Sequence, residues 1–236
     1  MLLSFPNWVI HISSALEWGI AAAIFIRYGM LSGRKEIRLF GISMLPHWIG
    51  SFFVLSYHIS GDTIPVLLDL SELINLFGSL ALLWATINLW QHGTNGSTAK
   101  ETRPPANGTQ LLSIGAILIA GKPQTWLGAD IFDTILQISS VIYLSFLVML
   151  LLVHRRDKSI FSPVSIAGFW FVLVFISVTI FCMYLATEVR HFPTLSHDNL
   201  LHGMAESLLS ISNLMIAIGA SQKLTEFKAG QQHKTA

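Results

Sequence analysis

The stretch LLHGMAESLLSISNLMIAIGAS, Leu200 to Ser221, decides the fold. It is long and apolar enough to cross a membrane as one helix. Because an α-helix turns by about 100° per residue, its polar side chains fall on one stripe: His202, Glu206, Ser210 and Asn213. An ionised carboxylate at membrane depth costs several kcal/mol. We therefore expect Glu206 to face protein, meet a partner group or take up a proton, and not to face lipid.

Apolar runs of similar length recur along the whole chain. Its 236 residues are 53% hydrophobic and 11% charged, against about 25% charged in soluble domains. Backbone groups in lipid must bond internally, and the runs lack the alternation of barrel strands. The sequence therefore predicts an all-α polytopic membrane protein with six transmembrane helices, at residues 7–27, 39–58, 65–90, 131–153, 164–186 and 200–221. The net charge of +1 gives no reason to expect nucleic acid as a partner.

Polar side chains also interrupt the first and third spans. His11 and Glu17 lie in the first span, and Glu17 is deep enough in it to need a protein environment. Glu72 begins a polar sector of the third span that repeats the pattern around Glu206. Glu72 and Glu206 are therefore predicted to be counterparts.

The second span carries two histidines on one stripe. His47 and His58 are eleven residues apart. They could hold a haem or chlorophyll at each of two levels, or make hydrogen bonds between helices, and the spacing does not distinguish these roles. Pro46 removes one backbone donor from this span, which predicts a kink.

An internal repeat divides the chain. HISSALEW at 11–18 is echoed by QISSVIYL at 137–144, and SELINLFGSL at 71–80 by AESLLSISNL at 205–214. We interpret the chain as two three-helix repeats. The predicted domains are residues 1–91 and 128–222, joined by a linker at 92–127 rich in Gly, Pro, Ser, Thr and Asn and followed by a polar tail at 223–236.

The topology depends on a short apolar run at residues 111–121, about half the length of a helical crossing. If this run crosses the membrane or enters it, both halves have the same orientation and both basic loops, 27–38 and 154–158, lie on the cytoplasmic side. The amino terminus is then on the non-cytoplasmic side. The alternative is the inverted repeat familiar in transporters.

The parallel topology predicts a shared polar pocket in the outer half of the membrane. Its members would be the histidines and carboxylates of both halves: His11, Glu17, His58, Glu72, His197, His202 and Glu206. Such a group suits a proton relay, a metal site or a cofactor, and equally a network of packing hydrogen bonds. No HExxH, GxSxG, P-loop or CxxC motif occurs, so an enzyme is the less favoured class.

Two segments resemble known families. FPNWVIHISSALEWGIAAAIFIRYG at 5–29, with SMLP at 43–46 and YH at 57–58, resembles the membrane proteins of hypothetical chloroplast reading frame forty-nine, found in cyanobacteria and plastids. GFWFVLVFISVTI at 168–180, with LLHGMAESLLSISNL at 200–214, is similar to a second domain of unknown function that accompanies it in green-lineage genomes. The resemblance implies a photosynthetic or related membrane, such as a cyanobacterial thylakoid or plasma membrane or a plastid thylakoid.

The sequence leaves two main functions open. The first is an accessory or assembly factor of a photosynthetic membrane complex, whose pocket binds a pigment, a haem or a partner helix. The second is a small proton-coupled transporter that uses Glu72 and Glu206. The candidate binding residues are the same for both hypotheses: His11, Glu17, His47, His58, Glu72, His202, Glu206 and Asn213.

Overall fold

The computed structural model describes residues 3–92 and 128–235, and in these residues it is helical and has no strand. Six helical segments are long and apolar enough to span a membrane, which confirms the predicted all-α polytopic membrane protein. The α-helices are α1 (Phe5–Ser32), α2 (Lys35–Ser43), α3 (Leu45–Ile59), α4 (Pro65–His92), α5 (Ala129–Arg156), α6 (Pro163–Tyr184) and α7 (Asn199–Thr235). The second span consists of α2 and α3 together.

Local sequence sets where several helices begin and end. Pro163 occupies the first turn of α6, where its missing N–H costs no bond. Ser162 caps this helix, because its Oγ accepts from the N–H of Ser165 at 3.1 Å. Gly33 ends α1 with a φ of 68°, a conformation that glycine adopts without strain.

The expected kink near Pro46 is a break between α2 and α3. Met44 separates the two helices, and Pro46 has no N–H to continue the hydrogen-bond ladder. The indole Nε1 of Trp18 on α1 donates to the carbonyl of Met44 at 2.8 Å. A side chain from a neighbouring helix therefore makes a hydrogen bond to a backbone carbonyl at the break. Backbone polar groups inside a membrane need such partners, because lipid provides none.

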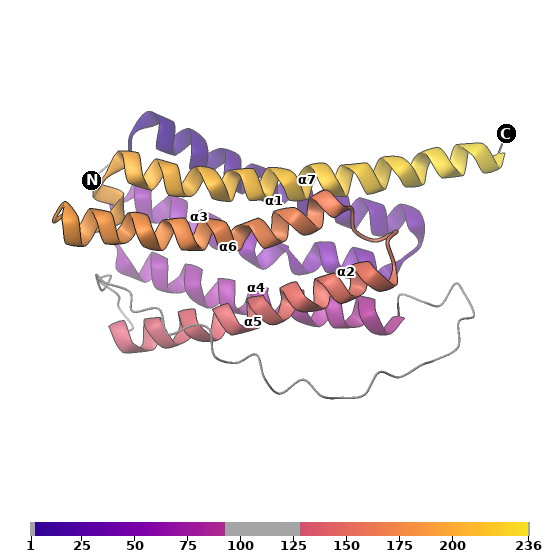
Figure 1. Cartoon of the computed structure of the whole chain (residues 1–236), viewed down its shortest axis with the longest axis horizontal. Helices are drawn as coiled ribbons and strands as arrows, with labels where there is room; N and C mark the ends of the chain where they lie inside the picture. The colour runs from indigo at the N-terminus through magenta and orange to yellow at the C-terminus, as the bar shows by residue number, and fades with distance from the viewer. Residues whose placement is uncertain (1–2, 93–127, 236) are drawn as a thin grey trace.

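Helices from the two halves of the chain pack against each other (Figure 1). The most extensive packing is between α1 and α7, between α6 and α7, and between α4 and α5. The backbones of α5 and α6 approach each other less closely, and these helices meet through side chains such as Phe146 and Phe169. The predicted halves therefore form one bundle. The domain division stays a prediction, as do the internal repeat and its boundaries. The short apolar run at 111–121 and the linker after residue 92 lie outside the described residues.

The two ends of the bundle differ in chemistry. At one end, here called the basic end, α1 and α5 finish next to the basic residues of 34–38 and 155–158. Tyr28 Oη donates to the carbonyl of Ser159 at 2.8 Å, and Arg156 Nη1 donates to the carbonyl of Trp90 at 2.8 Å. Because α1, α4 and α5 all end there, the two halves run in the same direction. The opposite end is called the histidine end.

The core is richest in aromatic rings toward the basic end. The rings of Phe40 and Phe161 are 4.9 Å apart, and those of Phe25 and Phe40 are 5.2 Å apart, both edge to face. Phe146 and Phe169 complete this buried cluster. Edge-to-face pairs stabilise by about 0.5–1.5 kcal/mol beyond the area that they bury.

The tail at 223–236, which we expected to be a separate polar segment, continues α7 as far as Thr235. Lys223 Nζ pairs with Glu226 one turn further on at 2.7 Å, and the ring of Phe227 lies 5.7 Å from that of Tyr28. These contacts tie the extension of α7 to α1 and support the helix beyond the apolar span.

Candidate functional site

Three buried histidines from three helices meet at the histidine end: His11 of α1, His58 of α3 and His202 of α7. Each side chain is at most 8% exposed. Nε2 of His11 lies 2.9 Å from Nε2 of His202. The ring centroid of His58 is 4.9 Å from that of His11 and 5.6 Å from that of His202. One ring nitrogen from each histidine lies within 4.8 Å of the other two. We call this group the histidine cluster.

Two carboxylates flank the histidine cluster. Oδ1 of Asp62 is 2.8 Å from Nδ1 of His58, so this nitrogen donates to the carboxylate and Nε2 carries the lone pair of the neutral ring. Oε2 of Glu206 is 3.8 Å from Nδ1 of His11. Burial acts to raise the pKa of Asp62, but hydrogen bonds from His58 and Ser196 outweigh it and hold the pKa below its usual range. Asp62 is therefore an anion at neutral pH.

The loop after α3 presents Asp62 to His58. Gly61 has a φ of 70° and Asp62 a φ of 62°, both in the left-handed region that glycine, asparagine and aspartate tolerate best. The chain therefore reverses at once after α3. The reversal brings the carboxylate back onto the imidazole one turn earlier.

Hydrogen bonds join the starts of α1 and α7, the two helices that carry His11 and His202. Nδ2 of Asn7 donates to the carbonyl of Asn199 at 3.0 Å, and the N–H of Ser4 donates to Oδ1 of Asn199 at 3.0 Å. A side chain at Gly203 would collide with the amide oxygen of Asn7. The absence of a side chain there lets α1 and α7 approach closely enough for their histidines to meet.

Asp198 fixes the first turn of α7. Its Oδ1 accepts from the N–H groups of Leu200 and Leu201, each at 3.1 Å, and its other oxygen pairs with Arg190. Burial acts to raise the pKa of Asp198, but these bonds and the charge of Arg190 lower it overall. The negative charge also suits a helix N-terminus. His202 therefore projects from a well-anchored first turn.

A second polar layer lies deeper along the seam between α1 and α7. Oγ of Ser210 donates to the two carboxylate oxygens of Glu17 at 2.8 and 3.1 Å. Nδ2 of Asn213 donates to Oγ and to the carbonyl of Ser14 at 2.9 and 3.1 Å. The polar stripe of α7 thus meets that of α1, and Glu17 and Asn213 contact partners in the other half.

Two of the eight candidate residues lie elsewhere, at the contact between α3 and α4. Nε2 of His47 is 3.4 Å from Oγ of Ser79, and Glu72 pairs with Asn75 on its own helix. The packing partners of α4 are α2, α3 and α5, and α7 is not among its main contacts. The structure therefore groups His11, His58, His202 and Glu206, and it does not bring Glu72 to Glu206.

Asp62 is not among the eight candidate residues predicted from the sequence. A signal was present, because Asp62 follows His58 by four residues at the end of a predicted helix. That spacing places two side chains on one helical face. The loop reversal retains this proximity although Asp62 lies beyond the end of α3.

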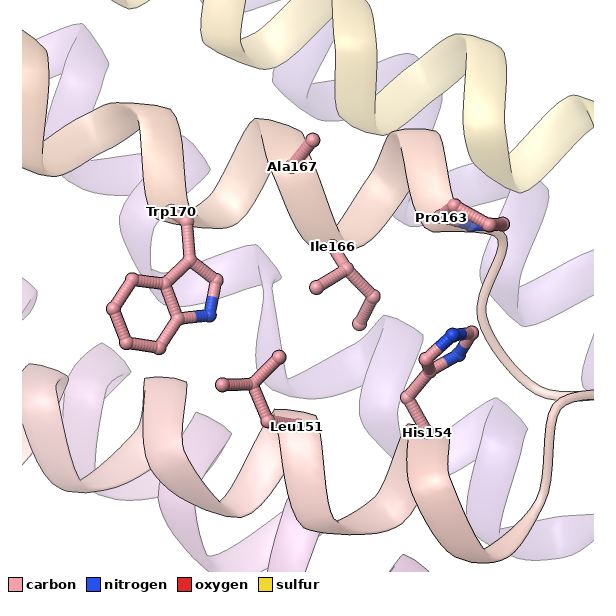
Figure 2. A pocket seen from close by; sticks show the side chains of 6 residues that line it. All are labelled: Leu151, His154, Pro163, Ile166, Ala167 and Trp170. Atoms are coloured by element: carbon pink, nitrogen blue, oxygen red, sulfur yellow. The ribbon is translucent and has the colours of Figure 1, made fainter.

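An apolar crevice elsewhere in the bundle is not part of this site. It lies between α5 and α6 and has a volume of about 330 Å³. Figure 2 shows Leu151 and His154 on one side and Ile166, Ala167 and Trp170 on the other. None of the eight candidate residues lines it.

The helices and the histidine cluster define an integral α-helical membrane protein with a buried polar site at one end. Residues 2–88 match the family described as "Protein of unknown function (DUF2499)". Residues 132–225 match the family described as "Protein of unknown function (DUF3593)". His11, His58 and Asp62 come from the first region and His202 and Glu206 from the second, so both regions build the site.

A curated relative supports the expected resemblance. The chain is 26% identical to the Ycf49-like protein of Synechocystis sp. over 100 residues, which are 42% of this chain and 96% of that protein. The chain thus resembles a Ycf49-like protein with a second domain, as expected from the sequence. No solved structure matches it significantly.

Proposed function

We propose that this protein is an accessory or assembly factor of a photosynthetic membrane complex, and that the histidine cluster and its carboxylates bind a small ligand for that role. The resemblance to a Ycf49-like protein supports the photosynthetic membrane. By the positive-inside rule, the basic end faces the cytoplasm or stroma. The amino terminus and the histidine cluster then face the lumenal or periplasmic side.

One observation carries the ligand-binding part of the proposal: three buried imidazoles from α1, α3 and α7 converge with Asp62 and Glu206 beside them. Scaffolding alone gives no reason to gather so many titratable groups, because each must be desolvated. Nδ1 of His202 is buried without a hydrogen-bond partner within residues 3–92 and 128–235. A buried polar atom left unpaired costs about 1–3 kcal/mol. Retaining that cost is typical of a functional site.

The transporter hypothesis receives less support. It requires Glu72 and Glu206 in one pocket, whereas Glu72 pairs with Asn75 along α4 and Glu206 approaches His11. A planar pigment or haem is also a poor fit between the three imidazoles, because ring centroids 4.9–5.6 Å apart leave no slot for a macrocycle. A smaller ligand suits the cluster better.

The test is to purify the tagged full-length protein in mild detergent from a photosynthetic membrane. We expect it to co-migrate with a photosynthetic complex on a native gel. The His202→Gln variant should lower the amount of that complex several-fold, and the His92→Gln variant, at the exposed basic end of α4, should not. Free migration of the protein, together with unchanged complex levels in a deletion strain, would refute the accessory role.

A further inference from the structure

We propose that the ligand of the histidine cluster is a single divalent first-row transition-metal ion, held by one ring nitrogen each of His11, His58 and His202. This inference rests on one part of the proposed function, namely that the histidine cluster binds a small ligand. The inference adds the chemical class of that ligand. Asp62 and Glu206 act as partners of the ligating imidazoles.

The spacing of the ring nitrogens suits one ion. A zinc-like ion binds imidazole nitrogens at about 2.0–2.1 Å, so two nitrogens of a tetrahedral site are about 3.4 Å apart. The three nitrogens of the cluster lie within 4.8 Å of one another, and the closest pair is separated by 2.9 Å. These separations bracket the tetrahedral value. Small rotations of the three side chains are therefore enough to place one ion between them.

The hydrogen bond between His58 and Asp62 fixes which nitrogen of His58 carries the lone pair, and Glu206 lies beside the outer nitrogen of His11. Because Nδ1 of His58 donates to Asp62, its Nε2 carries the lone pair when the ring is neutral. A proton on Nδ1 of His11, on the side of Glu206, likewise leaves a lone pair on Nε2. Carboxylates that hold the outer nitrogen of a ligating histidine are a recurrent feature of metal sites and raise the basicity of the ligand.

Two carboxyl groups lie beside the three imidazoles. Oδ1 of Asp62 is 2.8 Å from Nδ1 of His58, and Oε2 of Glu206 is 3.8 Å from Nδ1 of His11. Oxygen atoms next to the ligating rings favour a cation in the cluster, because an uncompensated positive charge in a membrane interior is costly.

The donor set also selects the class of ion. Three imidazoles suit zinc, copper, nickel and iron, whereas magnesium and calcium prefer oxygen ligands. Cys182, on α6, packs in a separate apolar cluster with Ala186, Leu195, Leu201 and Ala205 and is not one of the three ligands. Three protein ligands leave a fourth position for water or an exchangeable ligand. The site is therefore suited to binding an ion reversibly or using it, and not only to fixing the fold.

The experiment uses the full-length protein in detergent, stripped with a chelator and titrated with Co²⁺, whose visible absorption reports tetrahedral nitrogen coordination. We expect one Co²⁺ per chain, displaced by one equivalent of Zn²⁺. His11→Gln, His58→Gln and His202→Gln should each weaken Co²⁺ binding at least 100-fold. Asp62→Asn should weaken it about 10-fold to 100-fold, as loss of an outer carboxylate does elsewhere.

Two matched controls separate the site from general histidine binding. His154→Gln, on α5, and His47→Gln, at the contact between α3 and α4, should bind Co²⁺ as the wild type does. If a glutamine variant does not fold, the milder Asp62→Asn and Glu206→Gln variants decide the question. The absence of stoichiometric Co²⁺ or Zn²⁺ binding by the wild type would overturn the proposal. Equal weakening by His154→Gln and His202→Gln would also do so.

The same preparations separate this inference from the proposed function. Co-migration with a photosynthetic complex, without any bound metal, would leave the accessory role standing and remove the metal. One bound metal ion per chain, in a protein that does not co-migrate with a photosynthetic complex, would support the metal site and remove the accessory role.

Discussion

The polar groups that connect the helices differ between the basic end and the histidine end of the bundle. At the basic end, Arg34 Nη2 pairs with Asp157 at 2.9 Å, and the guanidinium of Arg156 lies 4.9 Å from the ring centroid of Trp90 while it donates to that residue's carbonyl. At the histidine end, buried nitrogens face one another, and Nδ1 of His202 has no hydrogen-bond partner among the described residues. The contacts at the basic end stabilise the fold. The unpaired nitrogen at the histidine end destabilises it, and a bound ligand can offset that free energy.

The aromatic core follows the same division. Phe25, Phe40, Phe146, Phe161 and Phe169 are fully buried and pack together where the helices reach the basic end. At the histidine end, the side chains that connect α1 to α7 are instead Asn7, His11, Ser14 and Glu17. We infer that packing near the basic end provides most of the stability of the bundle and that the histidine end is free to serve function.

The largest expected effect comes from Phe40, at the centre of the aromatic cluster. Phe40→Ala should lower the free energy of unfolding in detergent by about 3–5 kcal/mol, because it removes a fully buried ring and leaves a cavity. Denaturant titrations followed by circular dichroism measure this. Co²⁺ affinity of the folded fraction should not change, and a parallel loss of Co²⁺ affinity would show that the two ends are not independent.

A smaller effect is expected from the metal itself. A ligand that binds only the folded state stabilises it by about 2.7 kcal/mol at 100 times its dissociation constant. Zn²⁺ at that excess should therefore stabilise the wild type and Phe40→Ala equally. His202→Gln should gain almost nothing, and the denaturation midpoint with and without Zn²⁺ measures the difference. Equal stabilisation of His202→Gln by Zn²⁺ would place the ion elsewhere.

The division between the ends was only partly predictable from the sequence. Helical periodicity placed His202, Glu206, Ser210 and Asn213 on one stripe, and this stripe does face protein. Periodicity shows that a helix has a polar face, but it does not show which neighbour that face meets. Six apolar helices can pack in several orders that bury similar apolar area. The periodicity of the sequence therefore could not predict that α7 packs against α1.

Glu72 illustrates the same limit. Its stripe resembles that of Glu206, and the resemblance suggested one shared pocket. In the bundle the polar face of α4 meets α3 instead, where Oγ of Ser71 donates to the carbonyl of Gly50 at 3.2 Å. The similar polar stripes of α4 and α7 therefore pack against different helices. Asp62 was missed for another reason, since its role depends on a left-handed backbone after α3 that periodicity does not describe.

The smallest expected effect concerns the Arg34–Asp157 pair at the basic end. Burial acts to raise the pKa of Asp157, but hydrogen bonds from Ser159 and the charge and hydrogen bond of Arg34 lower it overall. A carboxyl whose pKa is lower in the folded state stabilises the fold above its unfolded pKa, about 3.9. That contribution disappears as the pH falls through the folded value.

Arg34→Gln should therefore lower the free energy of unfolding by about 0.5–1 kcal/mol at pH 7, within the usual range for partly exposed ion pairs. The difference from the wild type should shrink as the pH falls below about 4, because Asp157 becomes protonated and the pair loses its charge. Lys35→Gln removes the same charge from the neighbouring exposed position and is the matched control. Denaturation midpoints between pH 3 and pH 7 measure both variants. A constant difference across this range would mean that Arg34 stabilises the basic end by packing and not through the charge of Asp157.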